Sequence, residues 1–328
     1  MNPDTRHPTP DTHIAVIILA AGKGTRMKST MPKVLHPVAG QPMLWHVLAA
    51  AQSLNPAKTV VITGYGADEV EAFTTAHFPG TLYARQTEQL GTGHAVMQAK
   101  PLLGGHTGPI VILYGDIMLS TRADVLPTLV REHAATPTGL TLLTAQVDNP
   151  TGFGRVFKQN GFLVNVEEKD CTPEQRLITT VNPCIYAVDG PLLWQLLDKV
   201  SNVNAQHEYY LTDILQLAAE GHHPISTEAV AAERPEIGMN TRAEIANMAS
   251  LWQDRKRREM MLAGVTLTDP ASVWFAPDTH IEADTTIHQN VVFGPGVHIG
   301  SGVTIEPFVS LSNSHIKPGT TVKSFTKA

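Results

Sequence analysis

The chain has 328 residues, 42% of them hydrophobic and 16% charged, and 30 acidic residues against 24 Lys and Arg give a formal charge of −6. This composition supports a folded core in two domains and supplies no net positive charge to attract nucleic acid or an anionic membrane. Two cysteines, Cys171 and Cys184, are too few for a disulfide scaffold or a multi-cysteine zinc site, which favours a reducing cytoplasm.

Residues 1–13 are polar and proline-containing and predict a loose tail with no secretory signal pattern. The longest apolar run, Ile14 to Ala21, is far shorter than the roughly 20 residues that span a bilayer, so it predicts a buried strand. We expect a first domain over residues 14–240, a linker helix over 241–264 and a second domain over 265–328.

Short β-branched runs separated by helical patterns predict the core of the first domain. The expected strands are Ile14–Leu19, Thr59–Thr63, Ile110–Tyr114 and Leu140–Val147, and the expected helices are Met43–Leu54 and Ala67–Ala76. This alternation predicts an α/β fold, a Rossmann-like open and mostly parallel sheet with helices on both faces. Ligands of such sheets bind beyond the carboxyl ends of the strands, so the loops after Leu19 and Tyr114 become site candidates.

A glycine-rich segment follows the first expected strand directly. Backbone amides around Gly22 and Gly24 can approach a phosphate closely, although an ordinary glycine turn remains an alternative. The segment is neither a dinucleotide fingerprint, because Met27 stands where a third glycine belongs, nor a P-loop. Arg26 and Lys33 can project toward the same strand ends, and two cations there suit a triphosphate.

Further along, residues 86–95 place amides, a hydroxyl and glycines ahead of an expected helix, a pattern that can read a base edge or remain a polar loop. Asp116 follows the Ile110–Tyr114 strand after Gly115. A carboxylate at this position can hold Mg²⁺ against a phosphate, or it can cap the following helix. The hairpin signal Asn160-Gly161 predicts a β-hairpin beside the sheet, not within it. The histidines show no zinc spacing, and no nucleophile motif indicates covalent catalysis.

The last ninety residues change character. Thr241 and Glu244 form a capping box for a helix that Gly264 ends, and its charged stretch, residues 254–259, predicts a solvated face in preference to a partner surface. Apolar residues then recur every six positions, which predicts short parallel strands coiled into a β-helix. The two registers are Ile281, Ile287, Phe293, Ile299, Ile305 and Leu311, and Val291, Val297, Val303 and Val309, with Ile316 and Val322 following one slip.

Taken in order, the segments 19–27, 32–35, 89–94, 114–116 and 208–213, followed by 262–265 and the repeats, resemble the bacterial N-acetylglucosamine-1-phosphate uridyltransferase family. The resemblance implies transfer of uridylyl from UTP to N-acetylglucosamine 1-phosphate, yielding UDP-N-acetylglucosamine for cell-wall and lipopolysaccharide synthesis. It also implies Mg²⁺, a cytoplasmic location, a left-handed β-helix and a homotrimer formed through that β-helix.

Residue roles follow from the same resemblance. Arg26 and Lys33 are expected to be catalytic, and Asp116 and Asn240 to hold Mg²⁺. The nucleotide would contact Leu19, Ala20, Ala21, Gly22, Lys33, Gln86, Gln89, Gly91 and Thr92. The sugar phosphate would contact Tyr114, Gly115, Asp116, Gly154, Glu167, Asn182 and Asn240.

Two departures from the family pattern leave alternatives open. Asn182-Pro183-Cys184 stands where the family has Asn-Thr-Gly at the sugar pocket, so glucose 1-phosphate as acceptor, or thymidylyl transfer, is the alternative reaction. The chain ends at Ala328 with few coils, so we expect no acetyltransferase activity from it, and an acyltransferase is disfavoured. A non-catalytic scaffolding role is the alternative class, and the joint presence of Arg26, Lys33, Asp116 and Asn240 favours the enzyme.

Overall fold

A computed structural model describes residues 13–118, 124–136, 139–159, 161–204, 206–230 and 238–328. The predicted tail, apart from His13, and the turn residue Asn160 lie outside these residues. The chain divides into two compact units, one formed by residues 1–34 with 44–238 and the other by residues 35–43 with 239–328.

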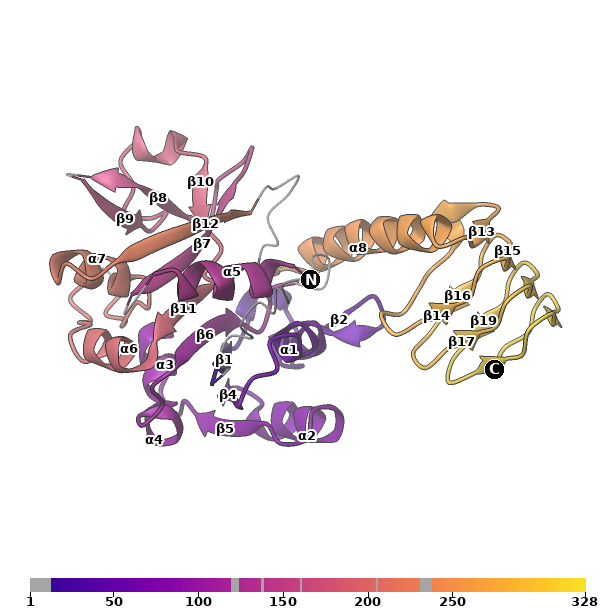
Figure 1. The fold of residues 1–328 in the computed structure, drawn as a ribbon, viewed down its shortest axis with the longest axis horizontal. Helices are drawn as coiled ribbons and strands as arrows, with labels where there is room; N and C mark the ends of the chain where they lie inside the picture. Colours follow the sequence, from indigo (N-terminus) through magenta and orange to yellow (C-terminus); the bar gives the residue numbers. More distant parts are fainter. Residues whose placement is uncertain (1–12, 119–123, 137–138, 160, 205, 231–237) are drawn as a thin grey trace, which may run out of the picture. The chain divides into compact units, whose positions relative to one another are not determined.

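The first unit is built on a ten-stranded sheet, which Figure 1 shows with its helices. The strand order is β5-β4-β1-β6-β11-β7-β10-β8-β9, and β12 pairs with β7. The strands are β1 (Ala15–Ala20), β4 (Lys58–Thr63), β5 (Leu82–Arg85), β6 (Pro109–Tyr114), β7 (Leu140–Gln146), β8 (Gly154–Gln159), β9 (Phe162–Val166), β10 (Thr180–Asn182), β11 (Tyr186–Asp189) and β12 (Ile225–Val230).

Parallel pairing joins the strands that the sequence pattern predicts. β1 lies between β4 and β6 and runs parallel to both, with Ile17 opposite Val60 and Ile112. β4 and β5, and β7 and β12, are also parallel, whereas β6, β11, β7, β10, β8 and β9 pair antiparallel in that order. The predicted open α/β sheet is confirmed, and β5, β4, β1 and β6 form a continuous parallel part of it.

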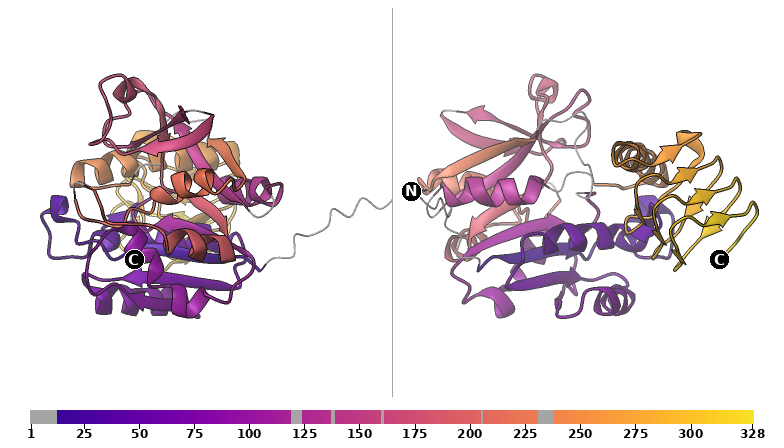
Figure 2. Two further views of the ribbon diagram at one scale, coloured as in Figure 1. Left: turned by 90° about the vertical axis from the view of Figure 1, so that its left-hand side faces the viewer. Right: turned by 45° about the vertical axis from the view of Figure 1, so that its right-hand side comes forward.

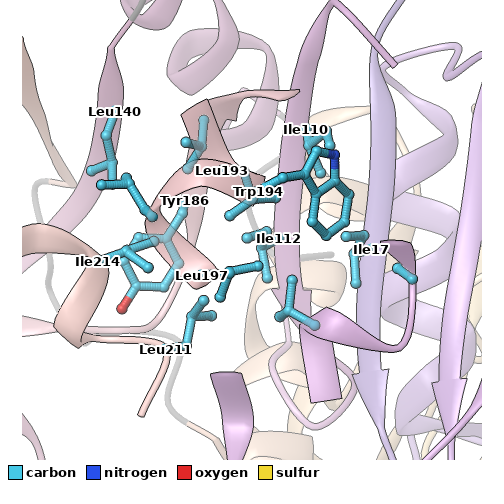
Figure 3. Close-up of a cluster of buried hydrophobic side chains, with 14 of the residues drawn as sticks. Ile17, Ile110, Ile112, Leu140, Tyr186, Leu193, Trp194, Leu197, Leu211 and Ile214 are labelled. Carbon is cyan, nitrogen blue, oxygen red and sulfur yellow. The ribbon is translucent and has the colours of Figure 1, made fainter. Parts of the chain in front are cut away.

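Helices cover the sheet. They are α1 (Met43–Gln52), α2 (Ala67–His77), α3 (Thr92–Met97), α4 (Lys100–Leu103), α5 (Val125–Ala134), α6 (Gly190–Leu197) and α7 (Asp213–Glu220), with short 3₁₀ turns η1 (Thr25–Met27), η2 (Lys33–Leu35) and η3 (Gln175–Leu177). Figure 3 shows one cluster of the core, in which Ile17 and Ile112 of the sheet meet Trp194, Leu197 and Ile214 of α6 and α7. Burial of such side chains contributes about 1.5–3 kcal/mol each, so this face of the sheet is fixed by packing.

The hairpin prediction was right in its strands and wrong in its place. β8 and β9 pair antiparallel as expected. However, β8 also pairs with β10, and β10 pairs with β7, so the hairpin is the edge of the same sheet. The reason is β10, a strand of only three residues that the sequence pattern does not reveal. It pairs with both β7 and β8 and so joins the hairpin to the sheet.

The second unit contains β2 (Pro37–Val38), β3 (Gln41–Pro42), α8 (Arg242–Leu262), η4 (Pro270–Ser272) and a left-handed parallel β-helix. Its coils, visible as stacked short strands in Figure 2, form three faces with the orders β13-β15-β18-β21, β14-β17-β20 and β16-β19. The strands are β13 (Thr266–Leu267), β14 (His280–Ile281), β15 (Thr286–Ile287), β16 (Val292–Phe293), β17 (His298–Ile299), β18 (Thr304–Ile305), β19 (Ser310–Leu311), β20 (His315–Ile316) and β21 (Thr321–Val322).

The six-residue registers are confirmed, since every predicted Ile, Leu, Phe and Val of the two registers is buried. The slip is confirmed as well, because Ile281 pairs with Ile299 across 18 residues and Ile299 with Ile316 across 17.

Helix α8 begins with the predicted capping box of Thr241 and Glu244. Its charged stretch is mostly exposed, yet the prediction of a solvated face is wrong for Arg257, which is buried and donates from Nε to the Val273 carbonyl at 2.9 Å. A guanidinium offers several donors in a fixed plane, and here it satisfies carbonyls of the first coil. No helix among the described residues has the length and apolar character needed to cross a bilayer.

Candidate active site

The two loops that the sequence singled out lie side by side. Leu19 is opposite Tyr114 in the pairing of β1 with β6, and the Gly115 amide donates to the Leu19 carbonyl at 2.8 Å. The segment after β1 and the segment carrying Asp116 therefore leave the same edge of the sheet together, at the carboxyl ends of parallel strands, where α/β sheets bind ligands.

The phosphate loop, residues 21–33, requires glycine at position 24. Gly24 has φ +61°, and a Cβ there would lie 2.6 Å from the Cβ of Lys33. The turn η1 follows and carries Arg26, whose side chain is exposed. Gly24 thus allows the two ends of the loop to close, so that Lys33 returns to the point where the loop begins.

Lys33 forms an ion pair with Asp116, joining Nζ to Oδ2. Both side chains are largely buried, with 12% and 15% of their surfaces exposed. A Cβ built on Gly238 would lie 3.2 Å from the same Oδ2, so the backbone at residue 238 also approaches the carboxylate. A cation and an anion are therefore held together where the phosphate loop meets the end of β6.

A second glycine loop, Gly64-Tyr65-Gly66, packs against the phosphate loop, and it was not among the predicted site segments. The Tyr65 amide donates to the Ala21 carbonyl at 3.1 Å, and its hydroxyl donates to the Thr30 carbonyl at 3.1 Å. The Lys23 ammonium lies 5.6 Å from the centre of the Tyr65 ring, within cation–π range. Tyr65 therefore contacts the start, middle and end of the phosphate loop.

The two flanking glycines allow this approach. A Cβ on Gly64 would lie 2.8 Å from the Ala21 carbonyl oxygen, and one on Gly66 would lie 2.3 Å from Cγ of Pro32. The repeated Gly-x-Gly after a predicted strand was the available signal in the sequence.

The predicted base-reading loop is fixed by its own amides. Gln89 donates from Nε2 to the Ala21 carbonyl at 2.9 Å, which ties the loop to the phosphate loop. Gln86 is buried and donates from Nε2 to the Gly91 carbonyl at 3.0 Å. The Thr92 hydroxyl accepts from the Leu211 amide at 3.0 Å. The predicted nucleotide residues thus converge from three separate segments.

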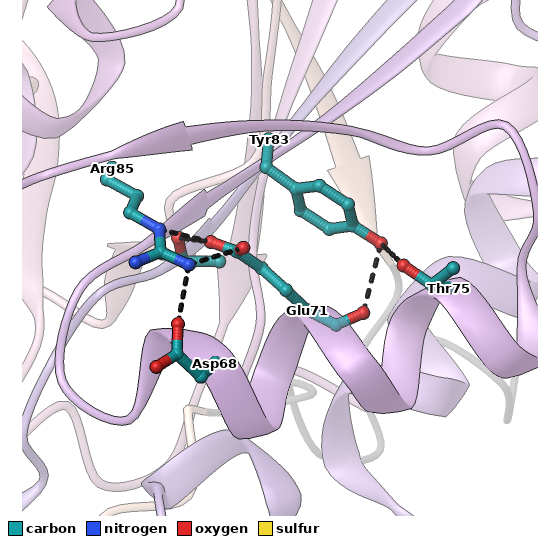
Figure 4. Close-up of polar contacts among 6 residues, drawn as sticks. Asp68, Glu71, Thr75, Tyr83 and Arg85 are labelled. Atoms are coloured by element: carbon teal, nitrogen blue, oxygen red, sulfur yellow. Dashed lines mark hydrogen bonds and ion pairs between the residues drawn. The ribbon is translucent and has the colours of Figure 1, made fainter.

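A polar network behind this loop, shown in Figure 4, links α2 to the ends of β4 and β5. Arg85 donates to Glu71 and Asp68 of α2, at 2.6 to 2.8 Å, and Thr63 donates to Glu71 at 2.7 Å. The Arg85 guanidinium, as the largest cause, holds the pKa of Glu71 below its usual value. Gln86 follows Arg85 in the chain, and its backbone amide donates to the Thr63 carbonyl at 2.7 Å, so the backbone of Gln86 is joined to the end of β4.

Around the residues predicted to bind the sugar phosphate, a chain of hydrogen bonds connects five residues. The Glu167 carboxylate accepts from Asn165 at 3.1 Å and from the Thr212 hydroxyl at 3.0 Å. Asn182 donates to the Asn165 amide oxygen at 3.2 Å and to the Tyr186 hydroxyl at 2.7 Å. Glu167 and Asn182 are thus joined through Asn165, which gives the site a preorganised row of hydrogen-bonding groups. Gly154 lies beside this row, where a Cβ would come within 2.5 Å of the Asn165 amide oxygen.

Cys184 lies at the centre of this region in an unfavourable conformation. Its φ is +62°, in the left-handed region that favours glycine, and its amide donates to the Asn182 side chain at 2.7 Å. Burial and then the Glu167 charge raise the pKa of the Cys184 thiol to about 12, and burial raises the pKa values of Tyr114 and Tyr186. All three side chains therefore stay protonated at neutral pH, as hydrogen-bonding groups and not as nucleophiles.

Acidic residues also gather near Glu167. Burial and the charges of Glu167 and Asp170 raise the pKa of Asp213 to about 6. Asp213 is the first residue of α7 and follows Thr212, so the negative charge on this side of the site increases as the pH rises through 6.

Asn240 belongs to the second unit, two residues after Gly238, and its backbone amide donates to Glu244 at 2.6 Å within the capping region of α8. The other predicted site residues belong to the first unit. Asp116 and Asn240 offer carboxylate and amide oxygens, the ligand types that Mg²⁺ prefers, and the donor chemistry of these residues fits that ion.

Two known protein families match the two parts of the chain. Residues 15–254 match the Nucleotidyl transferase family, and residues 278–313 match the bacterial transferase hexapeptide family of six repeats. Bifunctional protein GlmU of Paramagnetospirillum magneticum is 42% identical over 316 residues, covering 96% of this chain and 69% of the relative. Bifunctional protein GlmU of Zymomonas mobilis is 40% identical, covering 95% and 70%.

A solved structure from Bacillus anthracis, named as a glucose-1-phosphate thymidylyltransferase, matches with a TM-score of 0.60, covering 74% of this chain and 96% of that chain. At 21% identity it supports the fold alone. Sequence identity of about 40% across both units is the stronger finding, and it makes this chain a member of the GlmU family of nucleotidyl transferases with hexapeptide repeats.

Proposed function

We propose that the protein transfers uridylyl from UTP to N-acetylglucosamine 1-phosphate, giving UDP-N-acetylglucosamine and pyrophosphate. The observation that carries this function is the ion pair between Lys33 of the phosphate loop and Asp116, which follow β1 and β6, in a chain of the GlmU family. On the proposed nucleotide side, Gln89 is hydrogen-bonded to Ala21 of the phosphate loop. On the proposed acceptor side, hydrogen bonds join Glu167, Asn165 and Asn182 in a row.

The reaction needs alignment more than proton transfer. A phosphate oxygen of the sugar phosphate attacks the α-phosphorus of UTP, a new P–O bond forms, and the bond from the α-phosphorus to the bridging oxygen breaks to release pyrophosphate. The nucleophile is already anionic, so no general base is required. Catalysis then depends on in-line positioning and on neutralising charge. We assign that neutralisation to Lys33 and Arg26.

We assign Mg²⁺ to Asp116 and Asn240, whose oxygen donors fit it. When bound, the ion neutralises charge on the phosphates of both substrates. Within the described residues no group of three or more His, Cys, Asp or Glu side chains could hold a metal ion. Two protein ligands completed by phosphate oxygens and water are the usual arrangement for Mg²⁺ at phosphates.

For the nucleotide, we assign Leu19, Ala20, Ala21, Gly22, Gln86, Gln89, Gly91 and Thr92. The Gln89 amide nitrogen donates to Ala21, which directs its amide oxygen to accept, the role that the N3–H group of uracil requires. For the sugar phosphate, we assign Tyr114, Gly115, Gly154, Glu167 and Asn182. The Glu167 carboxylate and the Asn182 amide suit the hydroxyl and acetamido groups of the sugar.

Pyrophosphate release with UTP and Mg²⁺ tests the proposal, with N-acetylglucosamine 1-phosphate, glucosamine 1-phosphate and glucose 1-phosphate as acceptors and dTTP as the alternative donor. We expect a strong preference for UTP with N-acetylglucosamine 1-phosphate. Turnover only with another pair would keep the mechanism and change the substrate. Absence of turnover with every pair would overturn the enzymatic function and favour the scaffolding alternative.

We further propose a homotrimer assembled through the β-helix, in the cytoplasm. Exposed apolar side chains on the β-helix support an assembly surface, namely Trp274, Val292, Phe308 and Phe325. Both cysteines are free, which is consistent with a reducing compartment. A mass of three chains by light scattering is the expected result, and a monomer across a wide concentration range would contradict it.

A further inference from the structure

One face of the β-helix carries a vertical row of three histidines, the histidine ladder, formed by His280, His298 and His315. His280 pairs in register with His298, and His298 with His315, as the outward residues of β14, β17 and β20. All three are exposed, while Ile281, Ile299 and Ile316 beside them point inward. The ladder lies wholly in the second unit and has no part in the proposed nucleotidyl transfer.

The ladder persists across the slip in the repeat. His280 and His298 are 18 residues apart, whereas His298 and His315 are only 17 apart, yet both pairs are in register. The shorter coil therefore absorbs the missing residue elsewhere and keeps the third imidazole above the second.

The distances between the rings suit a shared metal ion. The ring centres are 5.9 Å apart for His280 and His298 and 6.1 Å apart for His298 and His315. Two imidazoles bound to one tetrahedral Zn²⁺ have ring centres about 5.2 Å apart, given Zn–N bonds of about 2.0–2.1 Å. Rotation of exposed side chains by less than about 1 Å at the ring closes this difference.

The imidazole groups of the histidine ladder determine which class of metal ion it would bind. Neutral imidazoles prefer Zn²⁺, Ni²⁺ and Cu²⁺ over the hard ion Mg²⁺. No group of three or more His, Cys, Asp or Glu side chains suited to one ion occurs in the described part of the chain. The ladder therefore offers two overlapping pairs that share His298, with water completing the coordination.

We propose that the histidine ladder binds one borderline transition-metal ion, such as Zn²⁺, between adjacent imidazoles. The site is separate in sequence from the oxygen ligands proposed for Mg²⁺, of which Asp116 belongs to the first unit and Asn240 precedes helix α8. Occupancy ties neighbouring coils together on this face and so stabilises the β-helix, because an ion that binds only the folded state shifts unfolding by mass action.

The test is Zn²⁺ titration of the full chain, without a polyhistidine tag, by competition with a chromophoric chelator. His298→Gln removes the imidazole common to both pairs and should weaken binding roughly tenfold or more, because the chelate is lost. His280→Gln and His315→Gln each leave one pair, so each alone should weaken binding only about twofold, the statistical factor for one of two sites. The double variant should match His298→Gln.

His288→Gln is the matched control. His288 follows β15 in the β-helix, and no histidine is in register with it on the described neighbouring coils. We expect it to bind Zn²⁺ as the parent does. Circular dichroism checks that every variant is folded, which outward positions should allow. Unchanged affinity in His298→Gln, or equal losses in all four single variants, would overturn the ladder as a metal site. Neither result would bear on uridylyl transfer.

Discussion

At the residue scale, the ion pair of Lys33 with Asp116 joins the two chemical roles of the site. Each side chain is more than four-fifths buried, so each charge depends on the other for compensation. Triphosphate would bring oxygens to Lys33, and a divalent ion would bring positive charge to Asp116. The triphosphate would therefore take the place of Asp116 as the partner of Lys33, and the metal ion would take the place of Lys33 as the partner of Asp116.

Asp116→Asn tests this arrangement. The amide keeps the shape of the carboxylate and removes its charge, so turnover should fall roughly 10²–10³-fold while the protein stays folded. Steady-state rates measured against Mg²⁺ concentration should show a higher requirement for the ion.

Asp198→Asn is the matched control, because Asp198 pairs with Lys100 at 2.6 Å on an exposed surface and should leave turnover unchanged. Near-normal turnover of Asp116→Asn at low Mg²⁺ would remove Asp116 from the metal site.

Cys184 provides a prediction that depends on pH. Its folded pKa is about 12 and the usual value is 9.0, so the thiolate fraction near pH 8 is roughly 10³-fold below that of a free thiol. In a Cys171→Ser background, iodoacetamide should react slowly at pH 8, and its rate should rise about tenfold per pH unit up to pH 10. A rate that levels off near pH 9 would show an ordinary thiol.

The raised pKa of Cys184 also makes the free energy of unfolding depend on pH. The unfolded thiol ionises near pH 9 and the folded one near pH 12, so the free energy of unfolding is unaffected below pH 9 and decreases above it. The slope between these values is about 1.4 kcal/mol per pH unit. Urea melts of the parent and Cys184→Gly, compared at pH 8 and pH 10, measure it.

At the element scale, the Gly64-Tyr65-Gly66 loop supports the phosphate loop. Tyr65→Leu removes both the hydrogen bond to Thr30 and the ring beneath Lys23, and it should lower kcat/KM for UTP roughly tenfold. Tyr65→Phe keeps the ring and should lose only about two- to threefold. The KM for the sugar phosphate should change little, because the contacts of the loop among the described residues lie on the phosphate loop, at Ala21, Lys23 and Thr30.

Tyr83→Phe controls for the loss of a tyrosine hydroxyl, since Tyr83 bonds to Thr75 and Glu71 on α2 and not to the phosphate loop. Thermal melting of all three variants separates positioning from stability. Equal effects on both substrates, or rates that follow the melting temperature alone, would reduce Tyr65 to a structural residue.

Local patterns explain which elements were predictable. Apolar runs set β1, β4, β6 and β7, and the capping box set α8, because each signal lies within a few residues of sequence. β10 escaped prediction because three residues carry no periodicity, and burial of Arg257 escaped because its carbonyl partners lie on a separate segment. The site follows the same rule: Asp116 and Lys33 stood out in motifs, whereas Tyr65 and the Arg85–Glu71 network depend on tertiary contacts.

At the scale of the whole molecule, the two units have separate cores. Ile112 is buried among strands and helices of the first unit, whereas Ile305 is buried between Ile287 and Val322 of adjacent coils. Stacked coils derive their stability from nearest neighbours, so damage to one coil spreads along the β-helix. It need not reach the sheet that holds the nucleotide loops.

Ile305→Ala therefore separates the two units. Deleting this fully buried side chain should cost about 2–5 kcal/mol and lower the melting temperature of the β-helix transition in calorimetry. Uridylyl transfer at 25 °C should persist, because Lys33, Asp116 and the base loop belong to the first unit and Asn240 of the second unit lies before α8, outside the coils. Thr304→Ala, at the outward neighbour on β18, should change neither quantity. A single transition that moves as a whole, together with lost turnover, would instead show that the coils and the nucleotide site unfold as one cooperative body.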